Sequence, residues 1–402
     1  MHPLTAIGCR LYQILFRLAI PLLPYRKPVR LGGVEDLPEL FANHGITRVL
    51  LVTDGSVHRL GLTGRLETVL AQANIACTIY DRTVANPTTD NVEQARALYV
   101  NGQCQAIIGF GGGSSIDCAK AVGARIAKPR QSLAKMKGIL KVHRRLPLLI
   151  AVPTTAGTGS ETTLAAVITD SRTRHKYPIN DFSLIPRFAV LDPEVTRSLP
   201  PALTATTGMD ALTHAVEAYI GRSTTRETRA DAIAAVRLIF ANLPQACASG
   251  DNIEARQNML QAAYLAGSAF TKSYVGYVHA VAHSLGGRYN IPHGLANAVL
   301  LPIVLEDYGA SAHRKLHALA TAVGLAEAGD THAAGAKKFI VAVKDMQQRL
   351  GIPAKLAGIC PADIPTLARQ AAKEANPLYP VPKLMTAQEL ERIYRAAMEV
   401  DA

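Results

Sequence analysis

The sequence lacks internal repeats, Gly-X-Y periodicity and long polar tracts, and only 18% of its 402 residues are charged. Because 49% of the residues are hydrophobic, these absences exclude a disordered, fibrous or low-complexity chain. The length exceeds one ordinary hydrophobic core. We therefore expect two domains, each with a packed interior.

Paired cysteines are also absent, because the six cysteines are spread singly and form no C-x-x-C motif. This distribution argues against a disulfide framework and against a thiolate zinc site. It fits a reducing compartment, and we expect a cytoplasmic protein.

Acidic residues are missing between Lys128 and Arg145, in a stretch rich in Lys and Arg of a chain with net charge +12. No aromatic residues interleave with these cations and no nucleic-acid motif accompanies them, so we expect no nucleic-acid partner. We interpret the stretch as a solvated basic loop that attracts an anionic substrate or cofactor.

The N-terminal stretch 4–22 shows helical spacing of apolar residues, with Arg10, Gln13 and Arg17 on the other side. The apolar positions are Leu4, Ile7, Leu11, Ile14, Leu15, Leu18 and Leu22. Two arginines and the following prolines argue against a membrane span, and a signal peptide does not fit either, so the mature chain is expected to start here. The pattern predicts an amphipathic helix that packs on its own body or on a second subunit. Peripheral contact with an anionic membrane surface through residues 4–22 stays open.

Short β-rich runs alternate with helical patterns between residues 30 and 199. The runs are 48–53, 76–80, 106–110, 148–152 and 188–191. This rhythm predicts a Rossmann-like α/β domain with a parallel sheet. After Pro200 and Pro201 the chain continues in long Ala- and Leu-rich helical stretches. We predict an N-terminal extension over 1–29, an α/β domain over 30–199 and an all-helical domain over 200–402.

Two polar loops follow predicted strands of the α/β domain. The first contains Gly111, Gly112, Gly113 and Ser114, where glycines allow close backbone approach and a helix start favours a phosphate. The second, residues 153–163, offers several hydroxyls beside two glycines. Since the carboxyl ends of parallel strands share one edge of a sheet, both loops are expected in one binding cleft.

Asp54 ends another predicted strand. A carboxylate there accepts hydrogen bonds from a ribose diol and repels a 2′-phosphate, which favours NAD over NADP. The alternative is an Asp that only forms the turn before Gly55.

The helical half contains a dense group of candidate metal ligands. Asp210 and His214 share one face of a helix, and His279 and His283 share a face of another, followed by a turn that can return His293. One carboxylate with neutral imidazoles suits Fe(II) or Zn(II). Peptidase chemistry is excluded because Ala280 stands where the general-base Glu of a zinc peptidase belongs.

Taken together, these motifs resemble the iron-containing, or group III, alcohol dehydrogenases. The resemblance runs from about Leu31 to Tyr394. It rests on the glycine loop with Asp117 and Lys120, on the loop 153–161, on residues 208–214 and on residues 279–294. It implies a dehydroquinate synthase-like architecture, in which metal and nicotinamide meet between an NAD-binding α/β domain and a helical domain. The N-terminal helix is extra to the usual start of the family.

The resemblance also implies roles for individual residues. Asp210, His214, His279 and His293 would hold the metal, Fe(II) or alternatively Zn(II), and His283 would be the non-ligand histidine near the nicotinamide. The residues that would hold NAD are Asp54, Asn86, Gly112, Gly113, Ser114, Thr154, Thr155, Thr163 and Lys176. Ala165, Phe270, Tyr274 and Val275 suggest a modestly apolar substrate pocket.

The resulting prediction is an NAD-dependent alcohol dehydrogenase that acts on a primary alcohol or its aldehyde. In this mechanism the cation lowers the pKa of the alcohol, and His283 carries the proton to solvent. A glycerol-type polyol dehydrogenase remains an alternative, as does a dehydroquinate-synthase-like cyclase, although such cyclases resemble this chain less because they carry Glu in place of Asp210. A homodimer or larger homo-oligomer is expected.

Overall fold

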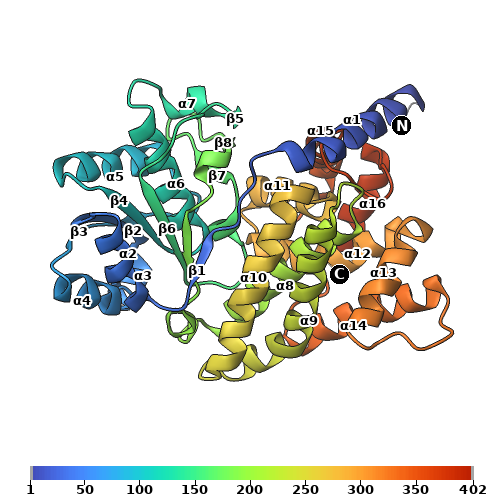
Figure 1. Ribbon diagram of the computed structural model, residues 1–402. Coiled ribbons are helices and arrows are strands. Elements are labelled where there is room, and N and C mark those ends of the chain that lie inside the picture. Colours follow the sequence, from blue (N-terminus) through green and yellow to red (C-terminus); the bar gives the residue numbers. More distant parts are fainter. Residues whose placement is uncertain (1–2, 400–402) are drawn as a thin grey trace. The chain divides into compact units, whose positions relative to one another are not determined.

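The computed structural model describes residues 3–399 and contains two compact units (Figure 1). One unit spans Pro24–Leu199. The other joins the N-terminal segment, up to Leu23, to the chain from Pro200 onward.

A six-stranded sheet forms the centre of the Pro24–Leu199 unit, in the order β1-β9-β6-β4-β2-β3 (Figure 1). Its neighbouring strands all pair in parallel. The strands are β1 (Val29–Leu31), β2 (Arg48–Asp54), β3 (Ala76–Thr83), β4 (Ala106–Gly111), β6 (Leu148–Pro153) and β9 (Phe188–Val190). The predicted parallel α/β fold is confirmed, and each of the five predicted runs is a strand of this sheet.

Helices cover both faces of the sheet because its strands are apolar on both sides. Leu50 and Val52 of β2 pack in one core with α5 (Thr89–Asn101) and α6 (Gly113–Ala127). Val49 and Leu51 point to the opposite core, which includes α2 (Leu37–Asn43) and α4 (Gly64–Gln72). The strand residues are fully buried, so they form continuous hydrophobic runs rather than an alternating pattern.

A smaller sheet completes this unit, in the order β5-β8-β7. Its strands are β5 (Gly138–Ile139), β7 (Ala165–Thr169) and β8 (Lys176–Asn180), and the remaining helices are α3 (Gly55–Arg59) and α7 (Leu133–Met136). The basic stretch 128–145 is more ordered than the predicted loop, since it includes α7 and β5. Buried Leu133, Met136 and Val142 hold it, while most of its cations are exposed.

The second unit is built from helices, as predicted. They are α1 (Pro3–Ala19), α8 (Pro201–Ile220), α9 (Arg226–Ala248), α10 (Ile253–Ser273), α11 (Tyr277–Tyr289), α12 (His293–Tyr308), α13 (Ala310–Ala322), α14 (His332–Arg349), α15 (Ile364–Ala375) and α16 (Ala387–Ala397). Capping boxes start α9 at Thr225 and α16 at Thr386. Over residues 3–399, no helix has the length and apolar character needed to cross a membrane.

Helix α1 packs on the helical unit by its polar side. The apolar stripe of residues 4–22 is exposed, whereas Cys9, Gln13 and Ile20 are buried. Arg10 and Gln13 donate hydrogen bonds to backbone carbonyls between residues 377 and 382. The helix therefore packs on its own body through its polar side chains, whose hydrogen bonds the backbone carbonyls of residues 377–382 accept, and the body leaves the apolar stripe uncovered. Contact of this stripe with a second subunit or with a membrane surface stays a prediction.

Candidate metal centre and dinucleotide-binding edge

Helix α8 carries the first two candidate ligands one turn apart, so Asp210 and His214 lie on the same helix face. The Asp210 side chain is only 3% exposed. The His214 ring is also buried, and it stacks on Phe270 of α10 with ring centroids 4.1 Å apart. A buried carboxylate needs donors or a cation nearby. This helix face therefore offers a site for a positive charge.

The turn between α11 and α12 brings the other two ligands to that face. Asn290 ends α11 in the left-handed conformation, and His293 is the first residue of α12. Gly294 allows the close approach, because a Cβ there would lie 2.6 Å from the carbonyl oxygen of Thr206 on α8. His279 comes from the first turn of α11 and is buried.

These four residues form one cluster. Asp210, His214, His279 and His293 each offer one ligand atom, and the four atoms all lie within 4.8 Å of one another. The Nε2 atoms of His293 and His279 lie 3.5 and 4.0 Å from Asp210 Oδ1. Burial lowers the pKa of His279 well below its usual value, as do the neighbouring histidines, so its imidazole is neutral. Three imidazoles and one carboxylate fit a divalent transition metal ion.

Glu217 orients one of these ligands, a role that the sequence analysis missed. Its Oε2 atom accepts hydrogen bonds from His279 Nδ1 at 2.6 Å and from the Gly276 amide at 2.7 Å, and its Oε1 accepts from the Val278 amide at 2.8 Å. With Nδ1 donating, Nε2 of His279 presents its lone pair to the cluster. Burial raises the pKa of Glu217 to about 7. The sequence signal for this role was the position of Glu217, three residues after His214 on the same face of α8.

Asn297 is a second missed residue, one turn after His293 on α12 and fully buried. Its Nδ2 lies 2.6 Å from Asp210 Oδ1, 3.0 Å from His293 Nε2 and 3.2 Å from His279 Nε2. Three acceptors therefore converge on one amide group, as expected of atoms arranged around a cation. The i, i+4 spacing from His293 was the only signal in the sequence.

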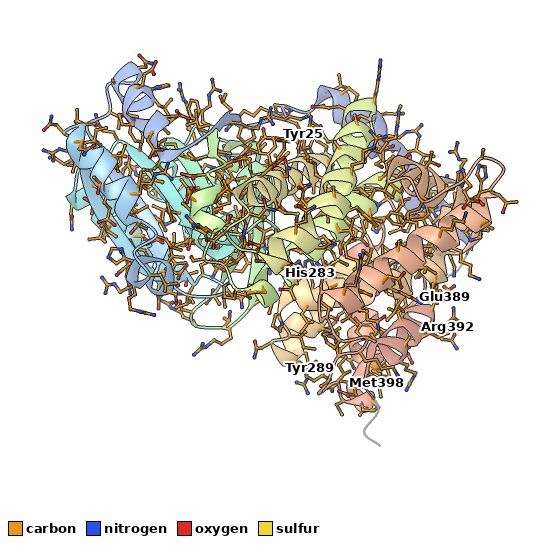
Figure 2. All side chains as sticks on the ribbon, turned by 90° about the horizontal axis from the view of Figure 1, so that it is seen from below. Tyr25, His283, Tyr289, Glu389, Arg392 and Met398 are labelled. Carbon is orange, nitrogen blue, oxygen red and sulfur yellow. The ribbon has the colours of Figure 1, made fainter. Side chains whose placement is uncertain are left out.

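His283 lies next to the cluster but is not part of it. Its ring stacks on that of His293, and its side chain is 43% exposed (labelled in Figure 2). Nδ1 of His283 lies 2.7 Å from Glu374 Oε1, which also accepts a hydrogen bond from Tyr379 OH at 2.7 Å. This arrangement is a chain of groups that can hold or pass a proton.

The residues predicted to line the substrate pocket have different surroundings. Phe270 covers the His214 ring, which places it beside the metal cluster. Val275 lines a small hollow with Gly276 and Tyr308, and Tyr274 packs against Phe16 of α1. Ala165 belongs to β7 of the α/β unit, where its carbonyl accepts from Lys120.

Within the α/β unit, the predicted cofactor residues gather at one edge of the sheet. Gly111 pairs with Pro153 and Val52 with Gly109, so β2, β4 and β6 end side by side. Gly112 precedes the first residue of α6, and Thr154 donates its amide to the Gly111 carbonyl. The loops with Gly113, Ser114 and Thr155 thus adjoin each other, as the parallel order predicts.

Asp54 caps α3 at this edge. Its Oδ1 accepts from the amides of Ser56 and Val57, while Oδ2 is 3.4 Å from Ser115 Oγ. The turn-forming role that the sequence left open is therefore present. Oδ1 forms the cap, and Oδ2 faces the glycine loop, where Ser115 Oγ is its partner.

The remaining predicted cofactor residues bond to one another and to Lys120. The Lys176 ammonium donates to the side-chain Oδ1 of Asn86 at 2.6 Å, and the backbone N–H of Asn86 donates to Ser114 Oγ at 3.4 Å. Thr163 Oγ1 accepts from the buried Lys120 ammonium at 2.8 Å. Burial lowers the pKa of Lys120 to about 8. Thr163 therefore anchors the loop as well as being a candidate contact.

Comparisons with known proteins cover both units of the chain. Residues 29–193 match the model of the iron-containing alcohol dehydrogenases, and residues 204–398 match the C-terminal part of the Fe-containing alcohol dehydrogenase family. The chain is 38% identical over 387 residues to a 1,3-propanediol dehydrogenase of Klebsiella pneumoniae, covering 95% of this chain and 99% of the relative. It is 35% identical over 379 residues to an NAD-dependent methanol dehydrogenase of Bacillus methanolicus, with 94% and 99% covered.

A solved 1,3-propanediol oxidoreductase has a similar structure, with a TM-score of 0.89, 38% identity, and coverage of 93% of this chain and 99% of that one. The chain belongs to the iron-containing alcohol dehydrogenase family. It is an oxidoreductase, and its α/β and helical units have the dehydroquinate synthase-like architecture of that family.

Proposed function

We propose that this protein transfers a hydride between a primary alcohol, or its aldehyde, and NAD, using a divalent metal ion held by Asp210, His214, His279 and His293. The observation that carries the proposal is the cluster of four ligand atoms within 4.8 Å of one another. When bound, the cation polarises the oxygen of the substrate and the nicotinamide accepts or returns the hydride.

The chain's own residues keep the ligands in the required protonation state. Glu217 accepts a hydrogen bond from the Nδ1–H group of His279, which fixes the tautomer, and two backbone amides hold the Glu217 carboxylate in place. The Asn297 amide donates to Asp210 and restrains its carboxylate. These contacts support a rigid site, because each ligand then needs little rearrangement to bind a cation.

We assign proton transfer to His283. Its Nδ1 bonds to Glu374, which Tyr379 also contacts, and its partial exposure gives the ring access to water. An imidazole titrates near neutral pH and can exchange the alcohol proton with solvent. In the alternative role His283 only packs against His293 and orients it.

For the dinucleotide, we propose that the glycine loop and the N-terminus of α6 receive the pyrophosphate, with Thr154 and Thr155 beside it. Gly111 supports this role, because it adopts a φ of +144° and a Cβ would lie 2.6 Å from Ser115 Oγ. Asp54 would bind the ribose diol through Oδ2, the oxygen that does not cap α3, and disfavour NADP.

For the metal and the substrate, we propose Fe(II), with Zn(II) as the alternative, and short alcohols or terminal diols. Names of relatives support this range, since one is a 1,3-propanediol dehydrogenase and another a methanol dehydrogenase. The Phe270 ring against His214 supports an apolar wall. A polyol dehydrogenase is the second candidate, supported by the diol named for the propanediol relative.

We also propose a cytoplasmic location, which the six free cysteines support.

The experiment combines elemental analysis of anaerobically purified protein with NAD-linked oxidation of a series of alcohols, including propane-1,3-diol and glycerol. We expect one divalent ion per chain, net formation of NADH, and loss of both metal and activity in His279→Ala. His283→Ala should keep the metal and lose rate.

The control is His313→Ala, which alters a histidine of α13 outside the cluster and should retain both metal and activity. Full metal content and activity in His279→Ala would remove the proposed centre. Product formation without net turnover of NADH would instead indicate a cyclase that regenerates its NAD. Sedimentation of the purified chain measures the homo-oligomeric state expected from the sequence.

A further inference from the structure

Helix α1 presents an apolar surface away from the body to which it is bonded. We use the name outward stripe for the residues Leu4, Ile7, Leu11, Ile14, Leu15, Leu18 and Leu22, all of which are exposed, from 48% for Ile14 to 86% for Leu22. At 100° per residue the positions from Leu4 to Leu18 lie on one side of α1, and Cys9, Gln13 and Phe16 lie on the other. Leu22 follows in the 3-10 turn Ile20–Leu22. Contiguous apolar surface of this extent marks a contact with another body or with a membrane.

The helix is held firmly in this orientation. The Arg10 guanidinium donates to the carbonyls of Val381 and Pro382 at 2.7 and 3.0 Å, and the Gln13 amide donates to that of Tyr379 at 2.8 Å. Phe16 packs edge-on against Tyr274, with ring centroids 4.9 Å apart. Since both the polar contacts and the aromatic contact lie on the inner side, α1 cannot turn its outward stripe inward without losing them.

The outward stripe continues onto the body of the helical unit. A hollow of about 400 Å³ is lined by Ala6, Ile7, Leu11 and Ile14 of α1, with Arg10 and with Leu384 from the segment before α16. The surface is therefore an apolar face with a shallow recess, not a row of isolated side chains.

The charge of this segment selects the partner. Helix α1 contains Arg10 and Arg17 and no Asp or Glu. Arg10 is bonded inward, whereas Arg17 is exposed at the flank of the stripe. An exposed basic side chain beside a Leu and Ile stripe matches a surface that is apolar and negatively charged, which is the chemistry of anionic lipids.

A second copy of the chain matches this surface less well. Two α1 helices paired through their outward stripes would offer Arg17 no acidic partner, because α1 carries arginines and no Asp or Glu. Like charges at an interface oppose association. An anionic bilayer meets both requirements, since it buries the leucines and neutralises Arg17.

From this geometry we infer that α1 is a peripheral membrane anchor, which lies in the plane of an anionic lipid surface with its outward stripe in the acyl region. Residues 29–193 and 204–398 match the family models, so the anchor lies outside them. The inference is independent of the proposed catalysis, because none of the outward-stripe residues belongs to the metal cluster.

The test is flotation of the full chain with vesicles of phosphatidylcholine alone or with phosphatidylglycerol added. We expect at least tenfold more binding to the anionic vesicles, and a decrease of that binding in high salt. The triple variant Leu11→Gln, Leu15→Gln and Leu18→Gln should lose at least tenfold in binding, because exposed leucines provide the insertion. Arg17→Gln should weaken binding to anionic vesicles only.

A matched control changes exposed apolar residues elsewhere, in the double variant Leu60→Gln and Leu203→Gln, and should bind as the wild type does. Circular dichroism and alcohol oxidation check that the triple variant is folded and active. Wild-type protein that does not float with anionic vesicles, or a triple variant that floats as well as wild type, overturns the inference. A triple variant that only changes the sedimenting mass assigns the stripe to contact between copies, which also overturns it.

Discussion

Replacement of Glu217 by Gln tests how much the metal centre depends on a group that contacts no metal. The change keeps the shape of the side chain and removes its charge. In the wild type, Oε2 accepts from His279 Nδ1 and from the Gly276 amide, and Oε1 accepts from the Val278 amide. A glutamine side chain offers one oxygen acceptor and one NH2 donor group. The three N–H groups that bond to the wild-type carboxylate would therefore face one acceptor and a further donor.

The magnitude follows from counting these bonds. If the new oxygen takes the Oε2 position, the amide nitrogen faces the Val278 N–H, and one buried donor loses its partner. That loss lowers the free energy of unfolding by about 1–3 kcal/mol. The bond to His279 also loses its charge assistance. Loss of the partner that orients a metal-binding histidine reduces metal affinity by about 10–100-fold.

The assay is anaerobic competition for the metal with a chelating dye, alongside urea unfolding of the metal-free protein. Asp181→Asn is the matched control, because Asp181 is a buried carboxylate that accepts the amides of Val142, His143 and Ser183 in the other unit. It should lose stability and keep its metal affinity. A Glu217→Gln protein with wild-type metal affinity would refute the orienting role, whatever its stability.

Three further predictions concern single residues. Gly294→Ala should reduce metal content at least tenfold, measured by elemental analysis, because its Cβ would lie 2.6 Å from a carbonyl oxygen of α8 and displace His293. Burial raises the pKa of Glu161 to about 7, because the folded protein favours the neutral carboxyl group. The resulting gain in the free energy of unfolding is present below pH 4.5 and is lost as the pH rises through 7. Urea unfolding should show that Glu161→Gln removes up to about 3 kcal/mol of this pH dependence. An unchanged slope of the unfolding free energy against pH would contradict the raised pKa of Glu161. Asp54→Asn keeps a cap oxygen and removes one charge, worth about 1 kcal/mol near a phosphate in water, so the ratio of kcat/KM for NADP over NAD should rise about fivefold; a constant ratio would exclude Asp54 from the ribose contact.

The α/β half was predictable because its strands are buried on both faces. A strand such as β4 is apolar throughout and is followed at once by Gly111 and Gly112, so both the strand and the loop at its end are visible in the sequence. Sheet order was not visible. The neighbours of β6 are β4 and β9, and this pairing depends on long-range contacts that no local pattern encodes.

The clustering of the four candidate metal ligands was predictable for a different reason, since histidine is rare and conspicuous when it recurs at helical spacing. Its supporting groups were not predictable. Glu217 and Asn297 look like ordinary polar helix residues, and only the packing of α8, α11 and α12 shows that their side chains meet His279 and Asp210. Burial converts them from surface-type residues into groups that must be paired.

Which side of α1 faces the body was left open by the sequence, because the hydrophobicity of the side chains does not show where buried backbone acceptors lie. The segment 377–382 contains three prolines, so it forms neither a helix nor a strand, and its carbonyl groups lack regular backbone partners. Arg10 and Gln13 supply those donors. Satisfying buried backbone acceptors therefore fixes which side of the helix faces the body, and the stripe of leucines is left outside as a consequence. A polar pair one turn apart on an apolar helix, together with a distant proline-rich segment, is the sequence signal for this arrangement.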